Sequence, residues 1–264
     1  MTNATLRFND KAAEQLLAVY VTPDMAEQRQ QVIGLLQLKP GEKALDIGSG
    51  PGFLASAMAD IVGSRGEVCG IDISPELLAL AGDRYRHQTQ LKFLHAEASS
   101  LPFADACFDV VTVTQVLEYL PDVRPALLEV HRVLRPGGQV LILDTDWDSI
   151  VWHAEDTARM KKILSAWDAH LADPYLPRTL GSSMRETGFQ VGEQKVIPLF
   201  NPEFREESFS NRMIDLIGPF VTGRNGITAE EVMAWAGELR RLGQEGNYFF
   251  SLNRYVFVGL KPDA

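Results

Sequence analysis

A glycine-rich turn between two apolar runs constrains the fold of this chain more than any other feature. The stretch Lys43–Phe53, KALDIGSGPGF, is an apolar run that ends in Asp46 and then breaks into glycines, and a second run, Cys69–Ser74, places Asp72 near its end. This order predicts a strand, a turn, a helix and a second strand with a carboxylate at its tip. Glycines at the turn let a ligand approach the main chain, because no Cβ stands in the way. The pattern predicts a site for a nucleoside-containing cofactor, with Asp72 suited to ribose hydroxyls.

Strands and helices alternate after the turn at Pro40-Gly41. The expected strands are almost wholly apolar, which is typical of a parallel sheet covered by helices on both faces. We therefore expect an α/β fold with a doubly wound sheet. The expected strands are 45–47, 68–73, 91–95, 108–113 and 139–144, and the expected helices among them are 52–61, 75–85 and 124–134.

The chain divides into three predicted regions. Residues 1–40 have helical spacing broken at Thr22-Pro23 and form a helical cap over the cofactor, residues 41–148 form the cofactor-binding core, and residues 149–264 supply acceptor-site helices and closing strands. In the last region we expect helices over 156–171 and 180–187, a strand over 190–197, a helical insertion over about 201–228, a helix over about 228–242 and a final strand over 248–260. The tetrapeptide Thr228-Ala229-Glu230-Glu231 fits a capping box at the start of its helix.

Composition and charge narrow the expected partners. The 264 residues carry a formal charge of −10 with scattered basic residues, so no nucleic-acid partner is expected. The N-terminal sequence lacks a cationic segment followed by an apolar one, and no apolar run approaches about 18 residues, so we expect a cytoplasmic protein without a membrane span. Cys69 and Cys107 lie in or beside apolar runs and are expected to be buried thiols. A homodimer is compatible with the sequence, which does not fix the oligomeric state.

Three details of the glycine turn bear on the identity of the cofactor. A dinucleotide fingerprint ends in glycine where this chain has Phe53, and the Gly-Lys-Ser/Thr ending of a P-loop is absent. Asp46 stands two residues before the first glycine, which is a poor place for an acid beside a pyrophosphate. S-adenosylmethionine has no phosphate and offers a ribose diol, an ammonium and a sulfonium, so acids around its pocket are useful. The turn therefore favours S-adenosylmethionine.

The region from about Gly41 to Thr145 resembles the class I S-adenosylmethionine-dependent methyltransferases. It is most similar to the broad methyltransferase-type-11 group, which includes ubiquinone- and menaquinone-biosynthesis enzymes. The resemblance is carried by four motifs in order: ALDIGSGPG, GIDIS, HAEASSLPFADACFDVVTVTQVLEYLPD and LLEVHRVLRPGGQVLILD. It implies a Rossmann-like, mostly parallel seven-stranded sheet with an antiparallel last strand, an N-terminal helical cap and a helical insertion before the final strand.

The resemblance also implies roles for residues in the turn, at strand ends and in the cap. The implied contacts are Asp46, Gly48, Ser49, Gly50 and Gly52 at the methionine and ribose; Asp72 at the ribose hydroxyls; Ile73, Glu97 and Ala98 at the adenine; and Thr114, Gln115, Tyr20 and Arg29 at the methionine end. Most relatives have Asp where this chain has Glu97, so that contact would shift by a methylene. The alternative is that these polar residues cap helices or face solvent.

Candidates for the acceptor site follow the fifth predicted strand, at the carboxyl edge where open α/β sheets bind ligands. Methyl transfer from a sulfonium is an in-line displacement that depends mainly on alignment and a dry pocket, and a base is needed only where the acceptor must lose a proton. The candidate bases are His153, Asp146 and Asp148, and the candidate pocket walls are Trp147, Trp152, Phe204 and Phe220. The alternative is that the aspartates cap helices or are solvated, that His153 is a surface residue and that the aromatic residues are core.

The predicted activity is C-, O- or N-methylation of a small, apolar or aromatic molecule. The chain lacks the Asn/Asp-Pro-Pro-Tyr/Phe tetrapeptide used for base or amide nitrogens, and the corresponding place is Thr114-Gln115-Val116-Leu117. No metal is expected, because the alternating acids after residue 144 lack the continuation of a calcium loop. Two alternatives stay open: a non-catalytic S-adenosylmethionine-binding or partner protein, and an NAD-dependent oxidoreductase, which the missing third glycine disfavours.

Overall fold

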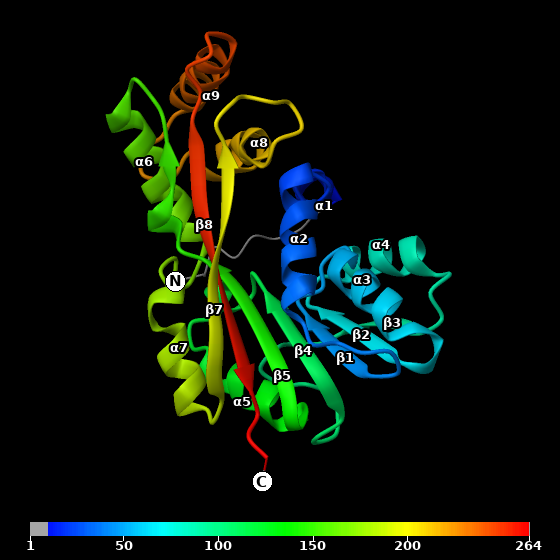
Figure 1. Ribbon diagram of the computed structural model, residues 1–264. Coiled ribbons are helices and arrows are strands. Elements are labelled where there is room, and N and C mark those ends of the chain that lie inside the picture. Colours follow the sequence, from blue (N-terminus) through cyan, green and yellow to red (C-terminus); the bar gives the residue numbers. More distant parts are fainter. Residues whose placement is uncertain (1–9, 264) are drawn as a thin grey trace.

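An eight-stranded sheet forms the centre of the computed structural model, which describes residues 10–263 (Figure 1). The order of its strands is β3-β2-β1-β4-β5-β8-β6, and β7 also pairs with β8. The strands are β1 (Lys43–Ile47), β2 (Glu67–Asp72), β3 (Leu91–His95), β4 (Phe108–Thr114), β5 (Leu134–Thr145), β6 (Val151–Trp152), β7 (Gln190–Asn201) and β8 (Phe250–Leu260).

Strands β1 to β5 are parallel, and β8 enters the sheet antiparallel beside β5. The doubly wound, mostly parallel fold with an antiparallel last strand is thereby confirmed. The sheet has one strand more than the seven expected. The extra strand is the two-residue β6, which pairs antiparallel with β8 through Trp152 and Phe250. A strand of two residues has no periodicity that a sequence pattern could show.

Helices surround the sheet and cover its carboxyl edge. They are α1 (Asp10–Tyr20), α2 (Pro23–Leu35), α3 (Phe53–Val62), α4 (Pro75–Tyr85), α5 (Arg124–Val133), α6 (Thr157–Trp167), α7 (Pro177–Glu186), α8 (Phe209–Val221) and α9 (Ala229–Gln244), with 3₁₀ turns η1 (Gly63–Arg65), η2 (Leu117–Tyr119), η3 (Trp147–Ser149) and η4 (Asp168–His170). Their starts have local causes. Thr22 and Ser74 accept hydrogen bonds from amides in the first turns of α2 and α4, and Thr228 opens α9 with the expected capping box.

Each face of the parallel sheet packs on its own hydrophobic core. One core joins α5 and α7 to residues such as Ile47, Val111 and Ile142. The other joins α2 and α3 to the alternate residues of the same strands, including Ala44 and Val110. Because successive side chains on a strand point to opposite faces, strands buried on both sides are apolar throughout.

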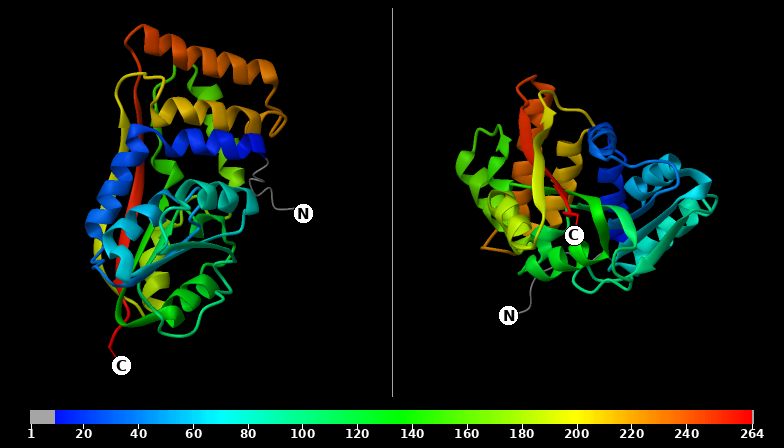
Figure 2. Two further views of the ribbon diagram at one scale, coloured as in Figure 1. Left: turned by 90° about the vertical axis from the view of Figure 1, so that its right-hand side faces the viewer. Right: turned by 60° about the horizontal axis from the view of Figure 1, so that its bottom comes forward.

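A third core lies beyond the carboxyl edge of the sheet. Strands β7 and β8 are long enough to extend past the parallel strands and carry α8 and α9 (Figure 1). The left view of Figure 2 shows α1 lying along α8, with α9 on the other side of α8. The buried residues of this core include Trp167, Phe209, Trp235 and Phe250. The predicted N-terminal cap and the helical insertion thus enclose this edge, while the division into regions at residues 40 and 148 stays a prediction.

Several element boundaries differ from expectation; α7, for example, begins at Pro177 and β7 runs on to Asn201. Strand β5 begins at Leu134, because the Pro136-Gly137-Gly138 segment expected to precede it is part of the strand. The helix expected over 156–171 ends at Trp167 and continues as η4. Among residues 10–263, no helix combines the length and the apolar character needed to cross a membrane. Most of the N-terminal segment used for the location prediction falls outside the described residues.

Candidate functional site

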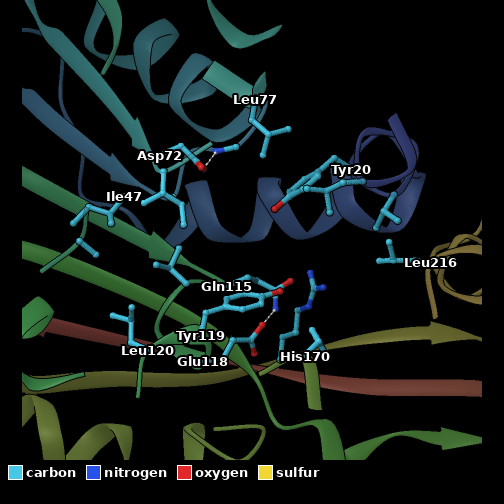
Figure 3. Close-up of a pocket in the computed structure, with 18 of the residues that line it drawn as sticks. Tyr20, Ile47, Asp72, Leu77, Gln115, Glu118, Tyr119, Leu120, His170 and Leu216 are labelled. Carbon is cyan, nitrogen blue, oxygen red and sulfur yellow. Dashed lines mark hydrogen bonds between the residues drawn. The ribbon is translucent and has the colours of Figure 1, made fainter. Parts of the chain in front are cut away.

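A cavity of about 450 Å³ lies between the carboxyl ends of the parallel strands and helices α1 and α8 (Figure 3). One side of its wall holds residues predicted to bind the cofactor: Tyr20, Gly48, Gly50, Asp72, Ile73, Glu97, Ala98 and Gln115. We call this side the glycine-turn half. The other side, which we call the aromatic half, holds Tyr119, Trp147, Trp167, His170, Phe209, Met213 and Leu216. In Figure 3, Asp72 and Leu77 face Tyr119, Glu118 and His170 across this space.

The glycine turn presents main chain to the cavity because its residues adopt backbone conformations that favour glycine. Gly48 and Gly50 have φ values of 68° and 51°. A Cβ on Gly48 would lie 2.1 Å from Val116 Cγ2, so a side chain there would clash with the segment after β4. Gly52 does not line the cavity itself; a Cβ there would lie 2.7 Å from Phe93 Cζ, so this glycine permits helix–sheet packing.

Asp72 fixes the turn and faces the cavity. Its Oδ2 accepts a hydrogen bond from the Gly50 amide at 2.8 Å, and its Oδ1 accepts one from the Ser74 amide at 2.9 Å. Burial raises the pKa of Asp72, and these hydrogen bonds oppose the rise. Each oxygen keeps a second lone pair, so Asp72 can also accept two vicinal hydroxyls. The neighbouring Ile73 is 60% exposed on the cavity wall and offers an apolar face to a flat ring.

A smaller hollow opens behind the glycine turn. The predicted cofactor contacts that line it are Tyr20, Arg29, Asp46, Gly48, Ser49 and Thr114. The Ser49 hydroxyl is buried there without a hydrogen-bond partner among the described residues. Burial raises the pKa of Asp46 to about 7, although Thr112 Oγ1 donates a hydrogen bond to it at 2.8 Å. The Arg29 guanidinium donates to the Tyr20 carbonyl oxygen at 2.7 Å. These groups suit the carboxylate and ammonium of an amino acid.

Gln115 lies where the two halves meet and has an unusual backbone. Its φ is 57°, a left-handed conformation that is uncommon in residues other than glycine and that clusters at functional sites. Its side-chain amide donates hydrogen bonds to Thr145 Oγ1 at 2.5 Å and to Glu118 Oε1 at 3.4 Å. These bonds orient the side chain along the cavity wall.

The aromatic half is enclosed by rings in mutual contact. The Trp167 ring centroid lies 5.9 Å from that of Trp147, edge to face, and 3.8 Å from that of His170, stacked. Trp147 comes from η3, directly after β5, and the other two come from the end of α6 and from η4. On the opposite side, α8 contributes Phe209 and Leu216. A flat apolar molecule fits these surroundings, in which few polar groups compete for it.

His170 is held as a neutral imidazole with a defined tautomer. Its Nδ1 contacts the Trp167 carbonyl oxygen, which can only accept, so Nδ1 carries the hydrogen. Burial lowers the pKa of His170 to about 4. The ring is therefore uncharged near neutral pH, and its Nε2 is a hydrogen-bond acceptor in the cavity wall.

Three ionisable side chains are buried beside the meeting point of the halves: Glu118, Asp144 and Arg254. Glu118 accepts hydrogen bonds from the Thr145 amide and the Trp147 indole, each at 3.2 Å, yet burial raises its pKa to about 7. Burial also raises the pKa of Asp144 well above its ordinary value, and the charge of Glu118 adds to the rise. Burial lowers the pKa of Arg254 to about 10. Three ionisable groups are thus gathered at one point beside the apolar rings of the aromatic half.

The three candidate bases lie outside the cavity wall. Asp146 is paired with Arg178, with 2.7 Å between Oδ2 and Nε, and the same guanidinium lies 2.8 Å from Asp148 Oδ2. Asp146 also caps η3. His153 is exposed, and its amide pairs with the Phe249 carbonyl oxygen at 2.9 Å. The structure does not bring these side chains to the cavity, and a catalytic role for them stays a prediction without geometric support.

Of the four aromatic residues predicted to wall the acceptor pocket, one lines the cavity. Trp147 does so from η3. Trp152 packs on Phe250 with ring centroids 4.9 Å apart, and Phe204 and Phe220 pack against other core rings outside the wall. These three residues belong to the hydrophobic core, as the alternative interpretation predicted.

Several residues of the cavity wall escaped the sequence analysis. They are Glu118, Tyr119, Trp167, His170 and Arg254. Two of them carry a signal: Arg254 is the only charged residue of β8, and Glu118 follows Gln115 within the same motif. Trp167 and His170 carry none, because they end an ordinary amphipathic helix and enter the site only through tertiary packing.

The sheet order, the glycine turn and the acid ending β2 define the class of protein as a Rossmann-like, class I S-adenosylmethionine-dependent methyltransferase. Residues 45–142 match the family model described as a methyltransferase domain. The chain thus carries a methyltransferase domain over these residues, and S-adenosylmethionine is the cofactor of that domain family. The residues present fit this cofactor. They provide a glycine turn without Cβ atoms, the Asp72 carboxylate held by the Gly50 amide, and the buried Ser49 hydroxyl, which has no hydrogen-bond partner among the described residues.

Named relatives cover part of the chain. A demethylmenaquinone methyltransferase of Lysinibacillus sphaericus is 38% identical over 122 residues, which are 46% of this chain and 52% of that protein. The chain thus spans about half the length of the curated relatives it matches. An inferred methyltransferase from Bacillus halodurans C-125 shares the fold with a TM-score of 0.64 and 19% identity, over 89% of this chain and 99% of that one. Phosphoethanolamine N-methyltransferase 2 of Haemonchus contortus, in complex with S-adenosyl-L-methionine, has a TM-score of 0.63 and 19% identity, over 98% and 58%.

Proposed function

We propose that this protein transfers the methyl group of S-adenosylmethionine to a small, apolar or aromatic molecule bound in the aromatic half. The observation that carries the proposal is the continuity of the cavity, whose wall runs from the glycine turn and Asp72 to Trp147, Trp167 and His170. A cofactor on one side and an acceptor on the other would therefore share one enclosed space. Such an arrangement favours direct transfer, because the reacting atoms are aligned and water is excluded.

The glycine-turn half supplies the positions for the cofactor. Asp72 would accept the ribose hydroxyls, Ile73 would pack on the adenine with Glu97 and Ala98 at its edge, and the hollow at Asp46 and Arg29 would take the amino-acid end. When bound, S-adenosylmethionine supplies an electrophilic methyl group on a sulfonium. The protein contributes alignment and desolvation, and no step requires the three candidate bases outside the cavity.

A quinone-related ring is the acceptor class that the relatives support. The similar protein of Lysinibacillus sphaericus is a demethylmenaquinone methyltransferase. The aromatic half offers stacking surfaces to a ring of that kind. Together with the glycine-turn half it forms one cavity of about 450 Å³. The neutral His170 would accept a hydrogen bond from a hydroxyl of such a ring through Nε2.

Calorimetry with S-adenosylhomocysteine and a transfer assay with methyl-labelled S-adenosylmethionine and soluble naphthohydroquinones test the proposal. We expect saturable binding of the cofactor product and label transfer to an aromatic acceptor. Absence of cofactor binding at near-millimolar concentration contradicts the proposal. Binding without transfer to any aromatic acceptor instead supports the alternative, a non-catalytic S-adenosylmethionine-binding or partner protein.

A further inference from the structure

Arg254 is a buried cation in the cavity wall that has no ion-pair partner in the part of the chain whose side chains the structure describes. Its residue is 3% exposed, and it lines the cavity from β8. Among residues 15–263, whose side chains the structure describes, no carboxylate lies within ion-pair distance of its guanidinium, and its Nε has no hydrogen-bond partner. Only Nη1 is engaged, by Gln28 Oε1 at 2.5 Å and Met25 Sδ at 3.1 Å. A buried charge without a partner is costly, so its retention indicates a ligand that supplies one.

The groups packed around Arg254 do not neutralise it at short range. Its electrostatic neighbours are Tyr20 at the end of α1, Glu118 and Tyr119 in η2, and Asp144 in β5. Burial raises the pKa of both tyrosines and both acids, so these groups favour their uncharged forms more than they would in water. On the remaining side, α8 places the Phe209 ring 5.1 Å from the guanidinium carbon, a cation–π contact that holds the side chain without neutralising it.

The position of Arg254 favours an acceptor over the cofactor as the missing partner. It pairs with Thr145 of β5, and β5 and β4 separate β8 from the glycine-turn strand β1. Three strand spacings of about 4.8 Å place the β8 backbone about 14 Å from β1. The amino-acid end of the cofactor has its own cation, Arg29, in the hollow behind the turn. Nη1 of Arg254 is already engaged by Gln28 and Met25, which line that hollow, and its guanidinium carbon lies 5.1 Å from the Phe209 ring of the aromatic half.

We propose, on the basis of the proposed function, that Arg254 binds the ionised hydroxyl of an aromatic acceptor in the aromatic half. The geometry fits a flat ring lying against the wall formed by Trp147 and Trp167, with its single negative oxygen directed toward the guanidinium. This narrows the acceptor class to phenols and hydroquinones. A fixed positive group at that point stabilises an oxyanion before and during transfer.

The step balances without a further reagent. On binding, the acceptor hydroxyl releases its proton to solvent, and the oxygen keeps the electron pair. The electron pair of the oxyanion, or of the ring carbon that it activates, then forms the bond to the methyl carbon. The methyl–sulfur bond breaks, and its electron pair stays on sulfur. In carbon methylation the ring C–H proton leaves afterwards and aromaticity is restored.

A chromogenic phenol tests the proposal without any turnover. The full-length protein, saturated with S-adenosylhomocysteine, is titrated with 4-nitrophenol, and the absorbance of the phenolate gives the ionised fraction of bound probe against pH. We expect the pKa of the bound probe to lie about one unit or more below its value in buffer. In Arg254→Met we expect this lowering to be lost, so that at fixed pH the ratio of ionised to neutral bound probe falls about tenfold.

Two control variants keep the outcome interpretable. Arg240→Met removes an exposed arginine paired with Asp215 and should leave the probe pKa as in wild type. Arg254→Lys keeps the charge and should retain part of the lowering; it replaces Arg254→Met if that variant does not fold. An unchanged probe pKa in a folded Arg254→Met variant overturns the proposal, as does a wild-type protein that does not bind the probe.

The same variants separate this proposal from the proposed function. If Arg254→Met binds S-adenosylhomocysteine about tenfold or more weakly while the probe pKa is unchanged, Arg254 belongs to the cofactor carboxylate and the proposal is wrong. Failure of wild-type protein to bind S-adenosylhomocysteine would contradict the proposed function itself. Normal cofactor binding combined with loss of the probe shift in Arg254→Met supports both.

Discussion

The glycine-turn half and the aromatic half of the cavity are built in different ways. The first is assembled from short segments that follow β1, β2, β3 and β4, together with Tyr20 of α1, and it presents the main chain of the glycine turn and the carboxylate of Asp72 to the cavity. The second takes its side chains from η2, η3, α6, η4 and α8, with Arg254 of β8 beside them, and these elements are spread from residue 117 to residue 260. A ligand site made of backbone tolerates little sequence change, whereas a site made of side chains can be altered without changing the fold.

The two halves also treat charge differently. In the glycine-turn half, Asp72 receives hydrogen bonds from two main-chain amides at 2.8 and 2.9 Å. In the aromatic half, Arg254 is buried without an ion-pair partner among the described residues, and the pKa of Glu118 is raised to about 7. The first half is therefore electrostatically satisfied by its own fold. The second contains a buried positive charge whose counter-charge a ligand can supply.

Replacing Asp72 by alanine should have the largest effect, and the property that changes should be cofactor affinity. The variant loses the acceptor for two ribose hydroxyls and releases the Gly50 amide that fixes the turn. Two hydrogen bonds to a charged acceptor contribute about 1.5 to 3 kcal/mol each, so the Kd for S-adenosylhomocysteine should rise at least about 100-fold. Calorimetry measures it, with the exposed Asp83→Ala on α4 as the matched control. An unchanged Kd would show that Asp72 does not contact the ribose.

Filling the aromatic half should produce the opposite pattern. Leu216 of α8 lines the cavity and is partly buried, so Leu216→Trp places an indole in the proposed acceptor space. We expect the acceptor KM to rise about tenfold or more while the Kd for S-adenosylhomocysteine stays within about twofold. Leu128→Trp on α5 introduces the same side chain at a 45% exposed position and serves as control. A parallel loss of cofactor affinity in Leu216→Trp would mean that the two halves are not separate sites.

The same contrast explains what the sequence could predict. The fold and the cofactor region were predictable because their signals are local: glycines at fixed spacing, an acid at a strand end and apolar strands. The acceptor candidates either follow the end of β5 or, like Phe204 and Phe220, are aromatic residues of the insertion, and among them only Trp147 lines the cavity. Asp146 and Asp148 face Arg178 of α7 instead, a contact that depends on how α7 packs.

The missed residues are distant in sequence and meet only in the folded protein. His170 becomes a site residue because α6 ends in η4 beside η3, and Arg254 because β8 is inserted next to β5. No local pattern encodes these two arrangements. The sequence offers two clues, the single charged residue Arg254 within an apolar closing strand and Glu118 close after Gln115, and the first can be used only once the sheet order is known.

The smallest predicted effect concerns the pH dependence of stability and comes from Glu118. Burial is the main cause that raises its folded-state pKa to about 7 from an ordinary value of 4.5. Between these two pH values the folded protein holds a proton that the unfolded chain releases. The contribution of Glu118 to stability is therefore fully present below pH 4.5 and is lost as pH rises through about 7. The loss amounts to at most about 1.4 kcal/mol per pH unit.

Glu118→Gln cannot titrate, so its free energy of unfolding should lack this slope. Urea unfolding at several pH values should show the wild type losing about 1 kcal/mol per pH unit relative to the variant between pH 5 and 7, with a constant difference above pH 8. Weakened hydrogen bonds to Thr145 and Trp147 shift the variant curve as a whole but do not change its slope. The exposed Glu193→Gln is the control. Parallel curves for wild type and Glu118→Gln would mean that Glu118 is already ionised in the fold, which would give Arg254 an anionic neighbour and weaken the contrast between the halves.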